Sequence, residues 1–318
     1  MHISRVALVD LDLALVSDLA VVRNAGLAEV TVPEHTGESL LMELTKSDEP
    51  PSAFWIARDG DAVVGYAGLT EPIHEYADAA FLGGAVTPSA QGEGIGRALL
   101  GEAIAGTERA VLRTRAYRGT TGAKALPALG FSRTMTHGVR RLVLADPIPE
   151  ELCSSVVEAS DDYDLVRRVG PTPETDLPEM MVLREAINDA PDALEWEAYP
   201  PERIAAYEQS LIERKQTQFT IIARHRATGE PAGLTMVCVH ELRPQVAAQE
   251  DTSVLPAHRG RRLGLRLKLE MADWLRAERP DVDAVDTWND ATNAPMIAVN
   301  QQLGARIVAE NSVYRRAR

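Results

Sequence analysis

"SVLPAHRGRRLGLRLK", residues 253–268, repeats the outline of an earlier stretch, "AVTPSAQGEGIGRALL", residues 85–100. In both stretches a valine and a proline precede a turn that contains glycine, and leucines follow the turn. Two further pairs of segments repeat in the same order: "FWIARDGDAVVGYAGL" (54–69) with "TIIARHRATGEPAGLTM" (220–236), and "ALPALGF" (125–131) with "AVNQQLGA" (298–305). Because order and approximate spacing agree over three segments, the sequence predicts two copies of one structural unit.

Each copy has the pattern of an α/β unit. A strand–turn–strand pattern precedes the glycine-containing turn, and a helix follows the turn. Leu263, Leu267, Met271 and Trp274 recur at helical spacing, so this helix is expected to pack one face on a sheet. The predicted fold class is α/β (α+β), with a mixed, mostly antiparallel sheet flanked by helices in each copy.

The boundary between the copies is expected in "ADPIPEE", residues 145–151. This stretch is acidic and contains two prolines, as linkers often do. We therefore predict an N-terminal domain over residues 1–147 and a C-terminal domain over residues 152–318.

Composition narrows the class of protein. The 318 residues carry a formal net charge of −14, which argues against nucleic-acid binding because that requires a basic face. No apolar run is long enough to cross a membrane, and Asp10, Asp12 and Asp18 interrupt the only N-terminal candidate for a signal-peptide core. Cys153 and Cys238 form no disulfide framework, and no metal-ligand spacing is present. We expect a cytoplasmic protein without a metal, and the sequence leaves its oligomeric state open.

The repeated turn is suited to binding an anion. A strand, a glycine-rich turn and a helix start direct several backbone N–H groups at one point, where the helix dipole adds partial positive charge. The Gly-Lys-Ser/Thr ending of a P-loop is missing, and the turn follows a hairpin rather than the first strand of a dinucleotide fold. The pattern therefore favours a phosphate or pyrophosphate site, with an empty strand–helix turn as the alternative.

"VTPSAQGEGIGRALL" resembles the motif of the GNAT superfamily of acetyl-CoA-dependent N-acyltransferases, Val-x-Pro-x-x-Gln/Arg-x-x-Gly-x-Gly/Ala. The first copy matches this motif in full, whereas the second carries Arg262 where the first glycine is expected. "TWNDATNAPMIAVNQQLGA" (287–305) resembles the closing segment of the family. Nearly the whole chain is thus similar to a tandem GNAT protein, a layout also similar to mycothiol synthase, although no motif singles out that enzyme.

The resemblance implies that loop amides hold the pyrophosphate of acetyl-CoA, and that its pantetheine arm runs beside the preceding strand. The residues implied in binding in the second copy are Val254, Leu255, Arg259, Gly260, Arg261, Arg262, Leu263, Gly264, Asn289 and Asn293. Those implied in the first copy are Val86, Gln91, Gly92, Gly94 and Gly96. The resemblance also implies direct transfer, in which a base acts near the amine and an acid near the leaving thiolate.

Polar side chains distinguish the two copies. Glu250 lies on the strand before the second loop, in the region where family members often carry the base, whereas the first copy has Leu82 there. Asn300 takes the slot where many relatives place an acidic tyrosine, and the first copy has Leu126. We therefore predict that the C-terminal domain is catalytic, and that the N-terminal domain binds coenzyme A at most.

Several roles stay open at this point. Asn300 can only hydrogen-bond a thiolate, so Tyr314 or water is the alternative acid, and the catalytic candidates are Glu250, Asn300 and Tyr314. Glu250 is alternatively an edge-strand surface carboxylate. Arg262 either contacts a phosphate or is a solvated surface arginine. His258, beside the loop, is expected to be exposed.

The acceptor is expected to be an amine. Residues 174–202 contain nine acidic residues and one basic residue, Arg184, together with Trp196 and Tyr199. The first helices of the family border the acceptor site, so this acidic segment suits a cationic amine, with a solvated helix face as the alternative. The predicted function is transfer of acetyl from acetyl-CoA to a primary amine of a small molecule. A protein N-terminal or lysine acetyltransferase and a non-catalytic acyl-CoA-binding module are the alternatives.

Overall fold

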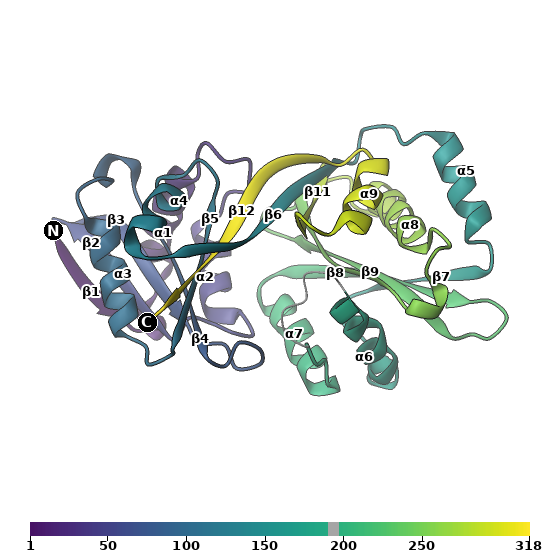
Figure 1. Ribbon diagram of the computed structural model, residues 1–318, viewed down its shortest axis with the longest axis horizontal. Helices are drawn as coiled ribbons and strands as arrows, with labels where there is room; N and C mark the ends of the chain where they lie inside the picture. Colours follow the sequence, from purple (N-terminus) through teal and green to yellow (C-terminus); the bar gives the residue numbers. More distant parts are fainter. Residues whose placement is uncertain (190–196) are drawn as a thin grey trace. The chain divides into compact units, whose positions relative to one another are not determined.

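The computed structural model describes residues 1–189 and 197–318, and it divides into two compact units (Figure 1). The first unit contains Met1–Gly138 and Val308–Arg318, and the second contains Val139–Ile307. The division therefore differs from a single cut at residues 145–151. The last strand of the chain, β12 (Arg306–Ala317), pairs with β5 (Val111–Tyr117) of the first unit, and Leu142 and Leu144 pack in the core of the second.

The first unit is built on one mixed sheet. Strands β1 (His2–Val6), β2 (Ala53–Asp59), β3 (Ala62–Thr70) and β4 (Ala79–Val86) are antiparallel neighbours, β4 is parallel to β5, and β12 and β6 (Ser132–Val143) follow. The helices of this unit are α1 (Leu13–Gly26), α2 (Gly37–Lys46), α3 (Ile95–Ala105) and α4 (Thr121–Ala125).

Both faces of this sheet are covered. Along β2, Phe54 packs in a core cluster with residues of α1 and α2, whereas Trp55 packs in the cluster that contains residues of α3. Successive side chains of a strand point to opposite faces, so a strand buried on both faces loses the apolar–polar alternation and reads as a continuous apolar run. The segment "AFWIA", residues 53–57, is such a run.

The second unit repeats this arrangement. Antiparallel strands β7 (Tyr163–Val169), β8 (Gln216–His225), β9 (Pro231–His240) and β10 (Val246–Val254) precede β11 (Ala284–Asp290), which is parallel to β10. The helices are α5 (Glu150–Ala159), α6 (Leu177–Glu185), α7 (Pro201–Glu213), α8 (Leu263–Glu278) and α9 (Ala294–Gln302). Helix α8 covers one face of the sheet, and α6 and α7 cover the other (Figure 1).

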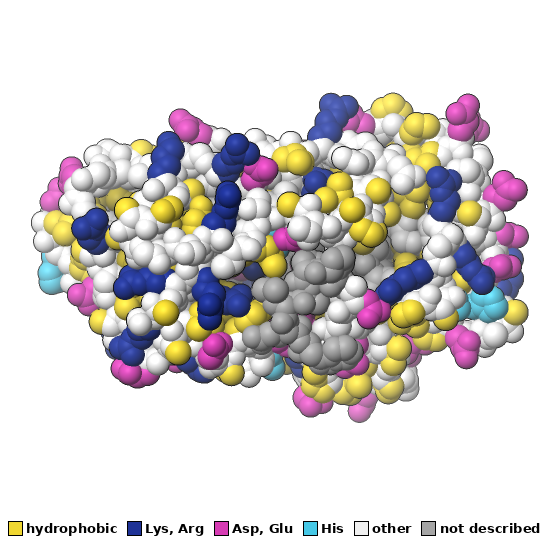
Figure 2. Space-filling view, viewed as in Figure 1, with side chains coloured by type: hydrophobic (Ala, Val, Ile, Leu, Met, Phe, Trp, Pro, Cys, Tyr) yellow, Lys and Arg dark blue, Asp and Glu magenta, His cyan; other side chains and the backbone are white. Residues whose placement is uncertain are grey.

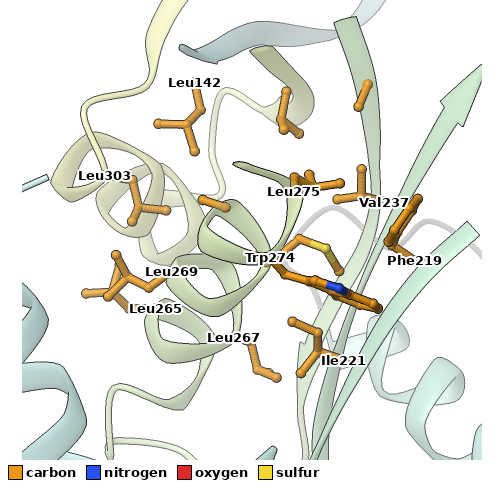
Figure 3. Close-up of a cluster of buried hydrophobic side chains, with 14 of the residues drawn as sticks. Leu142, Phe219, Ile221, Val237, Leu265, Leu267, Leu269, Trp274, Leu275 and Leu303 are labelled. Carbon is orange, nitrogen blue, oxygen red and sulfur yellow. The ribbon is translucent and has the colours of Figure 1, made fainter. Parts of the chain in front are cut away.

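The core of the second unit lies between α8 and the sheet. Trp274 points from α8 toward β8, where its ring meets Phe219 edge-on at a centroid distance of 5.1 Å (Figure 3). Ile221 packs in the same cluster, whereas its neighbour Ile222 packs against α6 and α7. The apolar stripe predicted for residues 263–274 therefore packs on a sheet, and the predicted α/β class with a mixed sheet in each copy is confirmed.

On the face shown in Figure 2, Lys and Arg side chains are interspersed with Asp and Glu side chains. Of the helices in the described part of the chain, none combines the length and the apolar character needed to cross a membrane.

Candidate active site

The two glycine-containing turns adopt the same structure. Each strand leads into a short 3-10 turn, η2 (Pro88–Ala90) after β4 and η6 (Pro256–His258) after β10. The side chain that follows donates back to the end of the strand in both: Gln91 Nε2 to the Val86 carbonyl at 3.0 Å, and Arg259 Nε to the Val254 carbonyl at 2.9 Å. The glutamine and the arginine thus hold equivalent loops in the same way.

Arg262 adopts the backbone conformation of the glycine it replaces. Gly94 caps α3 with φ 85° and ψ 0°, and Arg262 caps α8 with φ 54° and ψ 17°. A side chain in this left-handed region costs about 1–2 kcal/mol. The guanidinium donates to Ser155 Oγ at 2.7 Å and to Gln302 Oε1 at 3.4 Å, so α5 and α9 help to hold the loop. Arg262 is exposed, as the alternative of a surface arginine predicts, but its guanidinium is also bonded to these two side chains.

The loop of the second unit presents backbone donors. The N–H groups of residues 263–265 lie in the first turn of α8, where a helix offers them no acceptor. Nearby charges are partly balanced, because Arg259 pairs with Asp189 at 2.6 Å and Arg261 with Asp162 at 3.6 Å. Amides and helix dipole, more than net side-chain charge, therefore make this loop suitable for a phosphate.

A cavity opens between β10 and β11. The two parallel strands pair through residues 246–248 and 284–286, and beyond these pairs both strands continue. The cavity has a volume of about 210 Å³ and is lined by Glu250 and Asp251 from β10 and by Asn289 from β11. The predicted base and the predicted ligand Asn289 are thus brought together, and Asn293, at the start of α9, also lines the cavity.

Glu250 lies in a central strand and faces this cavity, which excludes the alternative of an edge-strand surface carboxylate. Burial raises the pKa of Glu250 and the charge of Asp251 raises it further, while Arg184 and a hydrogen bond from Tyr207 oppose the rise. The net shift is upward, so Glu250 holds a proton more tightly than an exposed glutamate does. A carboxylate of this kind is a better base near neutral pH.

The acidic segment contributes to the same cavity. Arg184, its single basic residue, is buried, pairs with Asp251 at 3.1 Å and lies over the ring of Tyr199 at 4.4 Å. Glu197 lines the cavity and accepts a hydrogen bond from the Tyr199 hydroxyl. The predicted contribution of Trp196 lies outside the described residues.

Asn300 is buried and contacts Asn289, which lines the larger cavity. Its Nδ2 donates to Asn289 Oδ1 at 2.6 Å, so α9 is tied to β11 through two predicted site residues. Asn300 also borders a second, small cavity of about 20 Å³, which Gln249 and Lys268 line as well.

Lys268 was missed from the sequence as a site residue. It is 6% exposed on α8, and its Nζ donates to Gln249 Oε1 at 3.3 Å. Burial lowers the pKa of Lys268 to about 7. The helical spacing of the sequence could have indicated this burial, because Lys268 lies one turn before Ala272 on the face of the helix that packs in the core. A lysine on such a face is unusual, since lysine is rarely buried.

Two sequence predictions need correction. Tyr314 pairs with Thr114 on β5 and packs in the core of the first unit, because β12 completes that sheet; it does not line the cavity of the second unit and is not retained as an acid. His258 is not simply exposed. Its Nδ1 lies 3.0 Å from the Tyr163 hydroxyl, and the centroid of its ring lies 5.8 Å from that of His225, with the two rings tilted by 40°.

The described residues contain no cluster of three or more His, Cys, Asp or Glu side chains arranged to hold a metal ion. The polar side chains that line the two cavities are carboxylates, amides, threonine hydroxyls, the Trp288 indole and one buried amine.

Comparison with known protein families assigns both halves of the chain to the same family. The acetyltransferase (GNAT) domain matches residues 50–132, and the acetyltransferase (GNAT) family matches residues 182–305. The protein is therefore an α/β acetyltransferase. In its second unit the glycine-containing loop precedes α8, and the cavity lies where β10 and β11 diverge. It belongs to the GNAT acetyltransferase family and carries two GNAT domains in tandem, as predicted.

Solved structures share this fold over the whole chain. A tandem GNAT protein from the clavulanic acid biosynthesis pathway is 24% identical, with a TM-score of 0.79 and coverage of 99% of this chain and 98% of that chain. A GCN5-related N-acetyltransferase from Sphaerobacter thermophilus is 18% identical, with a TM-score of 0.70 and coverage of 99% and 95%. An acetyltransferase of the GNAT family from Colwellia psychrerythraea is 12% identical, with a TM-score of 0.59 and full coverage of 100% of both chains. No curated protein matches this sequence.

The substitution Lys268→Met should stabilise the protein more at about pH 6 than at about pH 9. The pKa of Lys268 is lowered to about 7 in the folded state, so below that pH the folded protein buries a full charge. As pH rises from there toward the ordinary lysine value, the unfolded state binds more protons and the penalty is relieved.

The measurement is the difference in thermal midpoint between the variant and the wild type at the two pH values. We expect an increase of several degrees at the lower pH, since about 1 kcal/mol moves the midpoint by about 2–4 °C in domains of about 150–250 residues. Glu250 is present in both proteins, so its titration largely cancels. A shift of equal size at both pH values would contradict the assigned burial cost.

Proposed function

We propose that the second unit transfers the acetyl group of acetyl-CoA directly to a primary amine of a small molecule, with Glu250 as the general base. The observation that carries the proposal is the position of Glu250, a carboxylate of raised pKa at the mouth of two diverging strands, on the strand that leads into the amide-lined loop. Acyl transfer from acyl-CoA is the reaction of the GNAT family to which both domains belong.

The residues present fit acetyl-CoA as a substrate. The N–H groups at the start of α8 suit its pyrophosphate. The backbone of β10 beyond residue 248 has left its partner β11 and has groups to offer an extended amide-containing chain. At Gly264 a Cβ would make an ordinary contact of 3.7 Å with Val254 Cγ2, so a side chain much larger than a methyl group would fill the space between the start of α8 and the strand.

The acceptor side fits a small cationic amine. Glu250, Asp251 and Glu197 line a cavity of about 210 Å³ together with a single lysine, Lys268, and Arg184 pairs with Asp251. The remaining negative charge attracts a protonated amine, and Glu250 then accepts the proton that the amine must lose before attack.

The first unit lacks these groups. Leu82 takes the place of Glu250 and is buried in the apolar core together with Leu126, which takes the place of Asn300. The loop itself is complete, with Gly94 in the left-handed conformation. The first unit is therefore proposed to bind coenzyme A at most, without transferring an acyl group.

The test is release of free thiol from acetyl-CoA in the presence of a panel of small primary amines, a lysine-containing peptide and peptides with free N-termini. We expect turnover with one or more small amines. Turnover with peptides alone would assign the protein-modifying function instead. Measurable binding of coenzyme A without any turnover would leave only a binding module.

Glu250→Gln should lower kcat/KM by about 10²–10⁴-fold near neutral pH, the usual contribution of a general base. The loss should shrink toward about pH 10, where an amine of ordinary pKa deprotonates without help. Glu230→Gln, at an exposed turn, is the matched control and should leave the rate unchanged. An unaltered pH–rate profile in Glu250→Gln would remove the assigned role.

Gly264→Trp and Gly96→Trp test which unit is catalytic. Each places an indole at the start of the helix, beside Val254 or Val86, with nearest Cβ contacts of 3.7 Å and 3.6 Å. We expect Gly264→Trp to abolish turnover and Gly96→Trp to retain it, with circular dichroism confirming that both variants are folded. The reverse pattern would place catalysis in the first unit.

A further inference from the structure

A buried amine faces the proposed reaction centre and has no assigned role. Lys268 lies on α8 with 6% of its surface exposed, and among the described residues its Nζ has one hydrogen-bond partner, Gln249 Oε1, at 3.3 Å. An ammonium group has three donors, and burying it with so little compensation is costly. Such a group is more often found at a functional site than in a core.

Lys268 and Glu250 reach the same opening from opposite faces of the sheet. The register of β10 is irregular between Gln249 and Thr252, so contacts, not strand alternation, show on which face of the sheet Gln249 and Glu250 lie. Gln249 meets Lys268 on the α8 side, whereas Glu250 meets Tyr207 of α7 on the other side. Both Lys268 and Glu250 line the cavity where β10 and β11 diverge.

At the position where many relatives place an acidic tyrosine, this chain has Asn300, which is not an acid. Asn300 cannot release a proton, and its amide is already bonded to Asn289 at 2.6 Å. Lys268 and Asn300 line the same small cavity. The Lys268 amine can therefore donate a proton in the region where Asn300 cannot. Of the two alternatives, Tyr314 packs in the core of the first unit, and the other is water.

We propose that Lys268 is the general acid that protonates the leaving thiolate of coenzyme A in the second unit. This inference rests on the proposed acetyl transfer. A protonated amine first gives one proton to Glu250, which passes it to solvent. The neutral nitrogen then forms a bond with the acetyl carbon and loses a second proton to Glu250, which releases it to solvent after the reaction. The carbon–sulfur bond breaks with its electron pair on sulfur, and a proton passes from Lys268 Nζ to that sulfur. Lys268 is left neutral and regains a proton from solvent before the next turnover.

The surroundings of Lys268 are consistent with a proton that can be given up. Gln249 and Glu250 of β10, Thr287 of β11 and Asn300 of α9 face the cavities it lines. Asp286 on β11 is also buried, but its charge is balanced by a bidentate pair with Arg141 at 2.7 and 2.8 Å. Burial lowers the pKa of Lys268 to about 7, so the protonated and neutral forms are both accessible near neutral pH.

The first experiment measures the pKa of the coenzyme A thiol, bound to the full-length protein, from its thiolate absorbance. With Lys268 present, the thiol can pass its proton to the amine and form a thiolate–ammonium pair, so the pKa of the bound thiol should lie below the value measured for free coenzyme A in the same buffer. In Lys268→Met the bound thiol pKa should lie at or above that value. Equal thiol pKa values in both proteins would show that Lys268 does not reach the sulfur and would overturn the proposal. This readout needs no acceptor amine, so it is separate from a failure of the proposed function.

The second experiment compares kcat–pH profiles of the wild type, Lys268→Met, Lys268→Arg and the surface control Lys124→Met. The wild-type kcat should fall as pH rises through the titration of Lys268, and Lys268→Met should lose this descending limb with a kcat about 10²–10⁴-fold lower near neutral pH. Lys268→Arg keeps the charge but does not release a proton, so it should stay slow. If Lys268→Arg restored activity, Lys268 would stabilise charge and would not donate a proton. If mass spectrometry detected stable acetylation of Lys268, the lysine would capture the acyl group instead. Either result would overturn the proposal.

Discussion

The divergence of β10 and β11 is the constraint on which the site depends. The two strands pair through residues 246–248 and 284–286 and then separate, although both continue. Separation removes sheet partners from backbone groups in the middle of a covered sheet, and such groups need other partners. It also opens the sheet to side chains from both faces, so Glu250 and Lys268 border one cavity from opposite sides.

Under the proposed function, the second unit carries out the chemistry and the first unit does not. At equivalent places the first unit carries Leu82, Leu100 and Leu126, which form or border its apolar core. The second unit carries Glu250, Lys268 and Asn300 there. Buried polar groups weaken a fold unless they are paired, so replacing them by leucine is favoured wherever no reaction requires them. The apolar set in the first unit therefore supports a scaffolding or binding role for that half.

Local features were predictable from the sequence, and features that depend on distant contacts were not. Hairpins, the strand before the loop and the loop itself follow from β-branched runs, Val-x-Pro and glycine, which act within a few residues. The position of Tyr314 follows from the pairing of β12 with β5, which joins segments nearly two hundred residues apart and has no local signal. The burial of Lys268 was hidden for another reason. It lies next to four arginines in the sequence, and only the packing of α8 separates its side chain from that basic group.

Arg262 shows how the same loop can depend on different interactions in the two units. In the first unit Gly94 adopts the left-handed conformation at little cost, so the loop geometry is a local property. In the second unit Arg262 adopts the same conformation, which is energetically unfavourable for a residue with a side chain. Its hydrogen bonds to Ser155 on α5 and Gln302 on α9 offset part of this cost. The second loop is therefore coupled to α9, and α9 also carries Asn300, which is bonded to Asn289 in the cavity. Through this chain of contacts, the geometry of the proposed anion-binding loop and that of the proposed reaction centre are linked in the second unit.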